Sequence, residues 1–499
     1  MGHPERTVVA GAGLAGFRTV EELRARGYAG RITLVGAEDR PPYDRPPLSK
    51  KVLTDGVDPS LRADFAALDV DFRPAETATG LDTPAPDEVP LVHGSALITD
   101  RGKHPFDCLV IATGAVPITL PGPGPQRFLR TLDDALALRA LFRPGLRLAI
   151  VGAGWIGAEL ATAATAARCL VTVVEAAPAP LTAALGAEAG SRTAPWYERA
   201  GAELRTGTAV RSVEYGGLAL ADGGWLATDE VVTAVGVRPA VGWLAGSGVA
   251  FDNGVAVDPG LRASLPGVYA AGDCAAFESL RFGGRIRVEH WDSALHAPEV
   301  LAANILGDAE VYDPVPYFWS EQFGRMLQYA GHHQATDTLV WRGDPAAATW
   351  SACWLSGAGS SAAGPSAAGP SAAGPSAAGP SGRPSGARLT AVLTVDRPRD
   401  LLQGRRLIAA GAEVDITRIT DPGIPLKDCA ALQTVSRRGP CCGEFCWPAR
   451  AACTAMPAGR ASPKPAKDPA ARAPLTTSAR PSGAFRPLRA AAGRQQNPS

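Results

Sequence analysis

Two glycine-rich turns carry the residues best suited to bind a ligand. The first lies in VVAGAGLAG and the second, about 140 residues later, in LAIVGAGWIGAE. Their glycines are Gly11, Gly13 and Gly16 in the first turn, and Gly152, Gly154 and Gly157 in the second. An acid follows each turn, Glu38 after the first and Glu175 after the second, 22 and 18 residues beyond the last glycine. Such glycines let the backbone approach a pyrophosphate, and an acid at this distance binds a ribose hydroxyl. The two turns therefore predict two bound dinucleotides.

The second acid also indicates which dinucleotide the second turn binds. A carboxylate such as Glu175 accepts hydrogen bonds from both ribose hydroxyls and repels a 2′-phosphate. No Lys or Arg follows it in AAPAP, residues 176–180, to receive that phosphate. We therefore expect NADH rather than NADPH at this turn.

The sequence around each turn predicts the elements that position it. Each turn follows an apolar run typical of a buried strand and opens an apolar stretch typical of a helix. A later strand, at 267–271, brings Asp273 to a turn. This pattern predicts an α/β fold in which one Rossmann-like domain is inserted in another. The predicted domains are 1–115 with 245–320, and, inserted between these segments, 116–244.

The remainder of the chain predicts a smaller domain and two segments without a core. Strand-like runs and a helix-like run within 321–429 predict an α+β domain. Four copies of SAAGP interrupt it, and with proline every five residues we expect 358–387 to be a disordered insertion. Residues 430–499 are rich in Ala, Pro and Arg, which predicts a disordered basic tail.

The distribution of charges and cysteines indicates the cellular compartment of the protein and bears on whether it binds a metal. The chain has 49 basic and 49 acidic residues, but residues 431–499 hold 11 Lys or Arg and only two Asp or Glu. The first strand begins at Arg6, so we expect no secretory signal. The nine cysteines form no CxxC, so we expect free thiols in a reducing cytoplasm. The longest apolar stretch, residues 146–170, contains the second glycine turn, Glu159 and Arg168, so we expect a strand, a turn and a helix there and no membrane span. The cluster CCGEFC, residues 441–446, matches no zinc or iron–sulfur spacing, and we expect no metal.

A series of further motifs resembles one family of flavoenzymes. The motifs are, in order, PYDRPPLSK (42–50), ATG (112–114), FLRTLDDA (128–135), GAGWIGAE, YAAGDCA, VEHWDSA (288–294) and VPYFWSEQFG (315–324). The chain resembles, over about residues 6–428 apart from the insertion, the FAD-dependent, NADH-dependent ferredoxin and rubredoxin reductases of bacterial oxygenases. The resemblance implies the fold of glutathione reductase relatives, with a C-terminal interface domain. The first domain would then bind FAD and the inserted one NADH.

The resemblance also implies roles for individual residues. Lys50 and Glu159 would form a catalytic pair near the nicotinamide. Trp291 would open a helix whose positive end faces the flavin pyrimidine and favours its reduced, anionic form. The implied contacts of the two nucleotides are Gly11, Gly13, Ala15, Gly16, Glu38, Arg45, Lys50, Ala78, Ala112, Thr113, Gly114, Arg130, Asp273, Glu289, Trp291, Trp319, Gly152, Gly154, Ile156, Gly157, Glu159, Glu175 and Gly236.

Several of these residues also have a purely structural interpretation. Lys50 is compatible with a solvated lysine, and Glu159 with an exposed helix acid. Asp273 is compatible with the cap of a turn, and Arg130 with a structural ion pair. Glu38 is compatible with a loop acid, and the two tryptophans with ordinary core or surface aromatics.

The positions of the cysteines indicate how electrons leave. Disulfide reductases of this fold carry a CxxxxC near residues 46–50, whereas this chain has no cysteine before Cys108. We therefore expect electrons to leave from the flavin itself. The resemblance implies hydride transfer from NADH to the flavin, followed by transfer of single electrons to a ferredoxin-type iron–sulfur protein. The arginines expected to attract this partner, or else to form a solvated basic face, are Arg281, Arg285, Arg287 and Arg325. The alternatives are an NADH oxidase or quinone reductase and, from another class, an interaction protein like the apoptosis-inducing-factor branch, with a tail that binds nucleic acid. The sequence leaves the oligomeric state open.

Overall fold

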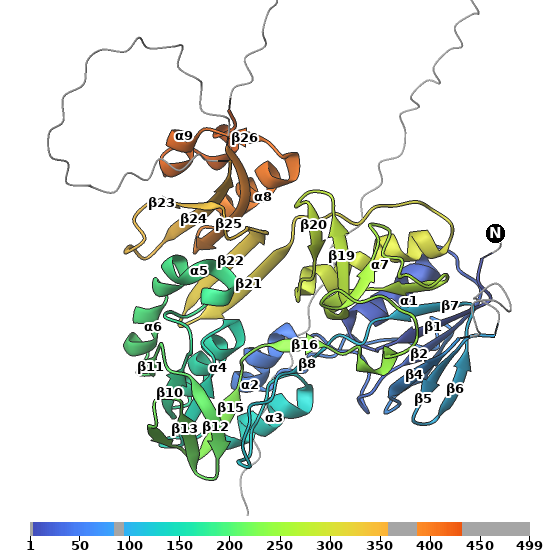
Figure 1. Ribbon diagram of the computed structural model, residues 1–499, viewed down its shortest axis with the longest axis horizontal. Helices are drawn as coiled ribbons and strands as arrows, with labels where there is room; N and C mark the ends of the chain where they lie inside the picture. The colour runs from blue at the N-terminus through green and yellow to red at the C-terminus, as the bar shows by residue number, and fades with distance from the viewer. Residues whose placement is uncertain (1–2, 84–93, 358–386, 432–499) are drawn as a thin grey trace, which may run out of the picture. The chain divides into compact units, whose positions relative to one another are not determined.

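The first nucleotide-binding sheet is parallel and is assembled from distant parts of the chain (Figure 1). A computed structural model describes residues 3–83, 94–357 and 387–431. The strands are, in spatial order, β18 (Val268–Ala270), β7 (Cys108–Ile111), β1 (Arg6–Ala10), β2 (Arg31–Val35) and β3 (Val70–Arg73). The apolar runs of the inner strands β7 and β1 are buried, as in sheets covered on both faces, whereas the edge strand β3 has no fully buried residue. The pairing of β18 with β7 confirms the predicted fold class, in which the chain returns to the first sheet after the insertion.

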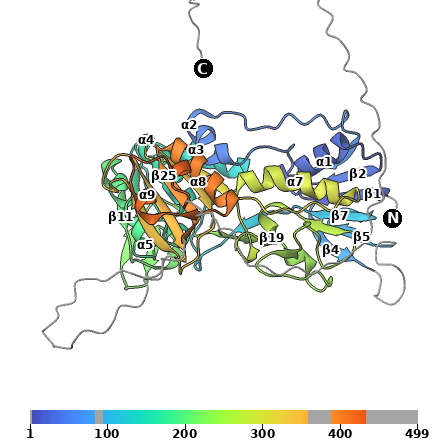
Figure 2. The ribbon, with the colours of Figure 1, turned by 90° about the horizontal axis from the view of Figure 1, so that it is seen from above.

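Two long helices lie side by side against this sheet. They are α1 (Leu14–Ala25) and α7 (Trp291–Ile305), and Figure 2 shows them next to each other. Leu23 of α1 and Leu301 of α7 are fully buried in the core that also contains Val9 of β1. The first turns of both helices are therefore fixed relative to the ends of the strands.

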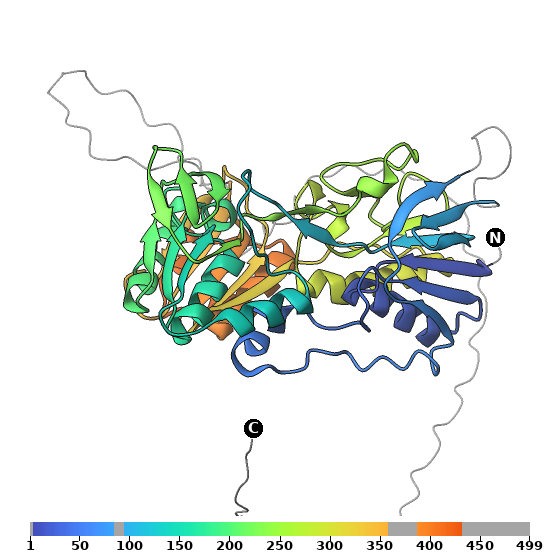
Figure 3. The same cartoon turned by 90° about the horizontal axis from the view of Figure 1, so that it is seen from below.

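Two smaller sheets, one antiparallel and one mixed, complete the first domain. One contains β4 (Ala78–Asp82), β5 (Ala96–Thr99) and β6 (Gly102–Pro105), and Figure 3 shows these light-blue strands beside the dark-blue parallel ones. The other sheet contains β17 (Val255–Val257), β19 (Ala275–Ser279) and β20 (Gly284–Ile286). Short helical segments at the connections are η1 (Pro46–Ser49), α2 (Lys51–Asp55), η2 (Gly242–Leu244) and η3 (Gly272–Cys274).

The second nucleotide-binding unit repeats the parallel arrangement. Its sheet has the order β11 (Glu203–Arg205), β10 (Leu170–Val174), β9 (Arg147–Val151) and β15 (Glu230–Thr233). An antiparallel sheet follows it, with β12 (Val210–Glu214), β13 (Gly217–Leu220) and β14 (Trp225–Ala227). The helices are α3 (Leu132–Leu141), α4 (Trp155–Ala166), α5 (Thr182–Ser191) and α6 (Ala194–Arg199). A two-stranded ribbon, β8 (Ala115–Pro117) with β16 (Val237–Pro239), carries the chain into and out of this unit.

The third unit is built around an antiparallel sheet. Its strands follow the order β21 (Tyr317–Gln322), β22 (Arg325–Gly331), β25 (Ala387–Val395), β24 (Trp350–Ser356) and β23 (Thr338–Arg342), and β26 (Glu413–Val414) pairs with β25. Its helical segments are α8 (Pro398–Ala410), α9 (Ile416–Thr420) and η4 (Leu426–Asp428). All of β21 belongs to this sheet, so the boundary predicted between 320 and 321 falls inside a strand.

Some predictions concern residues that the structure does not describe. The SAAGP repeats, the cysteine cluster at 441–446 and the tail beyond Ala431 lie outside the described residues. Within the described ranges, no helix is both long and apolar enough to cross a bilayer. The stretch 146–170 forms strand β9 and helix α4, as predicted.

Candidate functional site

The first glycine turn is shaped to admit a ligand at one position only. Gly11 has φ +114°, and a Cβ there would lie 2.2 Å from the Ala112 carbonyl oxygen. A Cβ on Gly16 would lie 1.8 Å from the Gly11 carbonyl oxygen. A Cβ on Gly13 would meet nothing within 4 Å, and Gly13 is the N-cap of α1, where no side chain caps the helix. The open, uncapped helix start is suited to a pyrophosphate.

The second glycine turn has the same construction. A Cβ on Gly152 would lie 2.4 Å from the Ala234 carbonyl oxygen, and one on Gly157 would lie 1.9 Å from the Gly152 oxygen. The space around Gly154, the uncapped N-cap of α4, is open to 4 Å. The two predicted turns therefore share both their close packing and their single opening.

The acid predicted to bind the second ribose lies directly at this turn. The Glu175 carboxylate accepts hydrogen bonds from the backbone N–H of Ala153 (2.7 Å) and Ala177 (2.8 Å). A carboxylate has about four acceptor positions, so others remain for ribose hydroxyls. Ile156, in the first turn of α4, is 40% exposed. The NADH contacts of these residues remain predictions.

Four residues predicted to contact FAD form one connected group. Arg130 Nη2 lies 2.7 Å from Asp273 Oδ2, and Arg45 donates to the Arg130 carbonyl oxygen (2.9 Å). Arg45 also pairs with Glu38 at 3.0 Å, and the Tyr43 hydroxyl donates to the same carboxylate at 2.6 Å. Burial lowers the pKa of Arg45. Arg130 thus does form the ion pair proposed as its structural alternative, and its partner is itself a predicted site residue.

The turn after β18 brings Asp273 to the first glycine turn. Gly272 has φ +76°, and a Cβ there would lie 3.0 Å from the Cβ of Ala15 in α1. The neighbouring ATG loop is held by Ala240, whose N–H donates to Gly114 (2.9 Å) and whose carbonyl accepts from the Thr113 hydroxyl (2.8 Å). Glycine at 272 therefore permits the close approach that places the Asp273 carboxylate.

Unsatisfied polar atoms around Asp273 fit a bound cofactor. Among the described residues, Arg130 Nε, Arg287 Nε and His290 Nδ1 are buried without a hydrogen-bond partner. Arg287 also donates to the Asp273 carbonyl oxygen at 3.0 Å. Burial lowers the pKa of His290 to about 4. Buried polar atoms are nearly always paired in complete structures, so this cluster, together with the open glycine turn, fits a bound FAD.

Lys50 and Glu159 form a buried ion pair. Lys50 Nζ lies 2.9 Å from Glu159 Oε2, and the Glu159 side chain is only 2% exposed. The hydroxyls of Ser49 and Ser320 also donate to this carboxylate, the latter to Oε1 at 2.6 Å. Glu159 is therefore neither an exposed helix acid nor a lone charge, and the lysine, 16% exposed, is not a solvated one.

The two predicted tryptophans contact each other. Trp291, the first residue of α7, meets Trp319 of β21 edge-on with ring centroids 5.7 Å apart. The Trp291 indole N–H donates to Asp44 at 2.9 Å. The Tyr317 ring is stacked with Trp319, with ring centroids 5.9 Å apart. The aromatic group thus joins the first domain to the third unit.

The remaining predicted residues occupy separate places. Ala78 begins β4, and Gly236, with φ +107°, precedes β16. Glu289 is paired with Arg287 at 2.7 Å, immediately before α7. Nothing in their described contacts assigns them to a ligand, and their roles remain predictions.

The four arginines expected to attract an acidic partner differ in their surroundings. Arg281 donates to the carbonyl oxygens of Ile408 and Ala409, Arg287 pairs with Glu289, and Arg325 pairs with Asp396 at 3.6 Å. Of these four arginines, Arg285 alone is both exposed and without an ion pair or side-chain hydrogen bond to another described residue. The predicted docking face is therefore reduced mainly to Arg285, because the other three cations hold the fold together.

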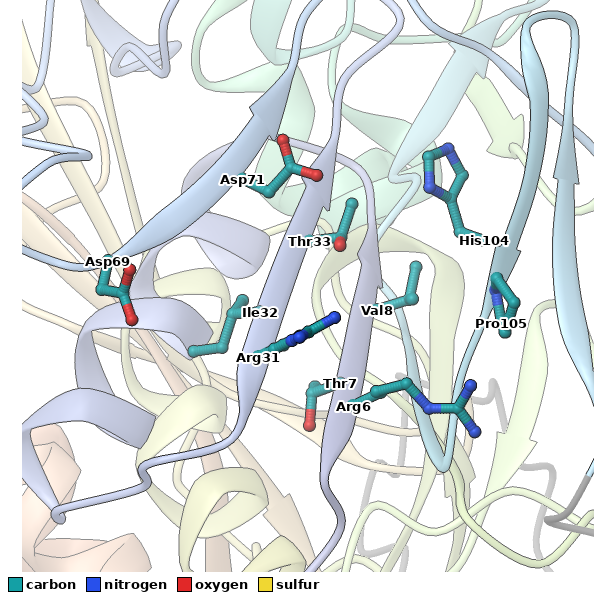
Figure 4. A pocket seen from close by; sticks show the side chains of 10 residues that line it. All are labelled: Arg6, Thr7, Val8, Arg31, Ile32, Thr33, Asp69, Asp71, His104 and Pro105. Carbon is teal, nitrogen blue, oxygen red and sulfur yellow. The ribbon is translucent and has the colours of Figure 1, made fainter.

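A separate hollow lies at the other end of the first sheet (Figure 4). It has a volume of about 560 Å³. Its lining is formed by Arg6, Thr7, Val8, Arg31, Ile32, Thr33, Asp69, Asp71, His104 and Pro105. Arg6 and Arg31 begin their strands, whereas the glycine turn follows the end of β1, so this hollow is not part of the nucleotide site. Its Arg6 is paired with Asp107 and its His104 with Glu76.

Sequence reasoning missed three of the groups that complete the two clusters, and it assigned the fourth, Arg287, to partner docking. Ser49, Ser320, Arg287 and His290 each lie next to, or two residues from, a predicted site residue. Strand alternation places Ser320 on the face opposite Trp319, which is the signal that could have drawn attention to it. Its partner lies 161 residues away, and no local pattern indicates that contact.

Comparison with known proteins accounts for nearly all of the described chain. The family model for pyridine nucleotide-disulphide oxidoreductase matches residues 5–297, and that for Reductase C-terminal matches 317–364 and 383–430. The anthranilate 1,2-dioxygenase system ferredoxin–NAD(+) reductase component of Burkholderia cepacia is 34% identical over 430 residues, 84% of this chain and 98% of that protein.

Solved structures agree with these matches. The crystal structure of Fdr9 is 47% identical, with a TM-score of 0.75, and the similarity covers 85% of this chain and 99% of that one. A chain of the covalent putidaredoxin reductase–putidaredoxin complex is 28% identical, with a TM-score of 0.73, over 85% and 98% of the two chains. These matches confirm the predicted fold class and the predicted cofactors, FAD and NAD(H). The chain therefore belongs to the pyridine nucleotide-disulphide oxidoreductase family and, within it, to the FAD-dependent ferredoxin–NAD(+) reductases that its motifs predicted.

Proposed function

We propose that this chain transfers electrons from NADH, through FAD, to a ferredoxin-type iron–sulfur protein that serves an oxygenase. The observation that carries the proposal is the buried pair of Lys50 and Glu159. Lys50 directly follows η1 of the first domain, and Glu159 lies on α4, two residues after the second glycine turn. The pair therefore stands where ligands of the two turns would meet.

The residues around this pair position the two nucleotides and supply fixed charge rather than transfer protons. When bound, FAD accepts a hydride from NADH and releases the electrons singly. Gly13 and Gly154 leave the two helix starts open to the pyrophosphates of FAD and NADH. Lys50 and Glu159 supply fixed charges next to the nicotinamide site, where burial makes them more effective than in water. The amino end of α7, at Trp291, would supply a positive dipole end toward the pyrimidine of a bound flavin.

The described thiols are unsuited to relay electrons. Cys108, Cys169, Cys274, Cys353 and Cys429 are free and buried. Cys274, which follows Asp273, has its pKa raised to about 11 by burial. A thiol with so high a pKa is almost entirely protonated at neutral pH and is a poor nucleophile. This supports direct exit of electrons from the flavin.

The relatives support the choice of acceptor. The Burkholderia relative is named as the reductase of a dioxygenase system, and a structural neighbour is the complex of a reductase with putidaredoxin. We extend the same class of small iron–sulfur partner to this chain. We also infer a cytoplasmic location, supported by the unpaired state of the described cysteines.

The test is NADH-driven reduction of a panel of ferredoxins and rubredoxins. The change in visible absorbance of each acceptor protein measures its rate of reduction. We expect at least one ferredoxin to be reduced much faster than menadione or oxygen. Treatment of the native protein with N-ethylmaleimide should leave this rate unchanged, because the described thiols are buried. Preference for a quinone or oxygen, or inactivation by the thiol reagent, would contradict the proposal.

A further inference from the structure

The two faces of strand β21 contact different parts of the proposed site. One face meets residues on the flavin side, and the other meets the helix on the NADH side. Trp319 and Tyr317 lie on one face, where Trp319 meets Trp291 at the start of α7. Phe318 and Ser320 lie on the other. Phe318 packs on Trp155 of α4 with centroids 4.9 Å apart, and Ser320 reaches Glu159 on the same helix. One strand of the C-terminal sheet thus contacts both the flavin-side tryptophans and the NADH-side helix.

The Glu159 carboxylate is held by donors from two separate parts of the chain. Oε2 accepts from Lys50 Nζ at 2.9 Å and from the Ser49 hydroxyl, both at the end of η1. Oε1 accepts from the Ser320 hydroxyl at 2.6 Å. Ser320 in turn accepts from the Gln322 amide at 3.0 Å, which directs its single proton toward Glu159. Ser320 and Gln322 are both fully buried.

We propose that Ser320 is a positioning residue for hydride transfer, which holds Glu159 and, through it, the Lys50 ammonium beside the nicotinamide site. The inference rests on the proposed function and adds to it that the C-terminal domain sets the geometry of the first half-reaction. No other described donor contacts Oε1. Without the hydroxyl, Oε1 of a buried carboxylate lacks a partner, and the carboxylate is held through Oε2 alone.

The strand itself does not depend on the Ser320 hydroxyl. The Phe323 N–H donates to the Thr162 hydroxyl of α4 at 3.0 Å, which is a second attachment of the end of β21 to this helix. Backbone pairing with β22 also continues through Gln322. Removal of the hydroxyl should therefore disturb the carboxylate and leave the strand in place. Misplacement of a catalytic group by about 1 Å can cost up to about a hundredfold in rate.

The experiment compares Ser320→Ala and Ser320→Thr in the FAD-loaded full chain. Threonine keeps the hydroxyl and suits a strand. Stopped-flow absorbance gives the rate constant of flavin reduction at saturating NADH, and equilibrium titration gives the dissociation constant of NAD+. We expect Ser320→Ala to lower the rate constant about tenfold, with less than a twofold change in NAD+ affinity and unchanged FAD content. Ser320→Thr should recover the rate to within about threefold.

A matched control removes a similar contact far from the pair. Ser351 is also fully buried in the C-terminal sheet, and its hydroxyl donates to the Asp400 carboxylate at 3.0 Å. Ser351→Ala should leave the rate of flavin reduction unchanged even where it lowers the melting temperature. An equal loss of rate in Ser351→Ala and Ser320→Ala would show a general structural effect and overturn the inference.

A double-mutant cycle tests whether Ser320 acts through Glu159. If it does, Ser320→Ala should have almost no further effect on the rate in a Glu159→Ala background. Additive losses would overturn the inference, as would a wild-type rate in Ser320→Ala. Failure of the proposed function is distinguishable, because the wild-type protein would then not be reduced by NADH or would not pass electrons to any ferredoxin.

Discussion

Arg130 and Asp273 form an ion pair of 2.7 Å although 143 residues separate them in the chain. Arg130 lies at the start of the inserted unit, and Asp273 lies after the chain has returned to the first sheet. The pair therefore forms only because the chain enters the inserted unit and later returns to the first domain. Its remaining unsatisfied atom, Arg130 Nε, is part of the buried polar group that fits FAD.

We expect Arg130→Met to weaken FAD binding at least tenfold, because it leaves the Asp273 carboxylate partly buried without its cation. The measurement is the dissociation constant of FAD for refolded apoprotein, by flavin fluorescence. The control is Arg127→Met, which removes a similar pair with Glu230 at 2.7 Å in the second unit. Equal losses in both variants would assign Arg130 a structural role only.

Glu175 should determine the choice of nicotinamide cofactor. Repulsion between its carboxylate and a 2′-phosphate should give a kcat/KM for NADH about a hundredfold or more above that for NADPH. Glu175→Ala should narrow this ratio at least tenfold, measured by ferricyanide reduction. Glu203→Ala, on the neighbouring strand β11, is the control and should leave the ratio unchanged. Equal use of both cofactors by the wild-type protein would refute the assignment.

Arg285 should contribute to attraction of the iron–sulfur partner. Arg285→Glu should slow ferredoxin reduction several-fold at low ionic strength, with a smaller effect at 0.5 M salt, because exposed charges are screened. The rate of flavin reduction by NADH should not change. Arg211→Glu, an exposed arginine on β12, provides the same change of charge elsewhere. A similar slowing in both variants would show that only net charge matters.

His290 should make stability depend on pH in the acid range. Burial lowers its pKa to about 4, whereas an unfolded histidine has a pKa near 6.5. Between these values the unfolded state binds more protons, so stability falls as pH decreases from about 6.5 toward 4. The loss is at most about 2 kcal/mol at pH 5. The melting temperature of His290→Gln should therefore fall less than that of the wild type between pH 7.5 and 5. An identical fall in both would contradict this.

The repeat-containing insertion should be dispensable for folding. Strands β24 and β25 on either side of it are adjacent and antiparallel, with Leu355 opposite Leu389. A short glycine-containing turn can therefore replace residues 361–386, because loop closure depends only weakly on length. Melting temperature and FAD content should both stay close to wild type. Loss of FAD would show that the insertion supports the fold.

The sequence by itself determined the two nucleotide turns and much of the architecture. Gly11, Gly16 and Gly157 are required by backbone contacts within their own turn or with the adjacent strand, so local spacing is sufficient to recognise them. Buried parallel strands are apolar throughout, and this marks β1, β7 and β9 in the sequence. The start of α7 at Trp291 also follows from a motif.

Only the tertiary structure decided which polar groups meet. Ser320 reaches Glu159 across 161 residues, and Arg281, expected to be free for a partner, donates to carbonyl oxygens of α8. Such contacts depend on how separate elements pack, so the residue pattern within one element does not predict them. A hydrogen bond forms only when donor and acceptor lie about 3 Å apart. The hydrogen-bond partners of a buried charge are therefore determined by how the three units pack together.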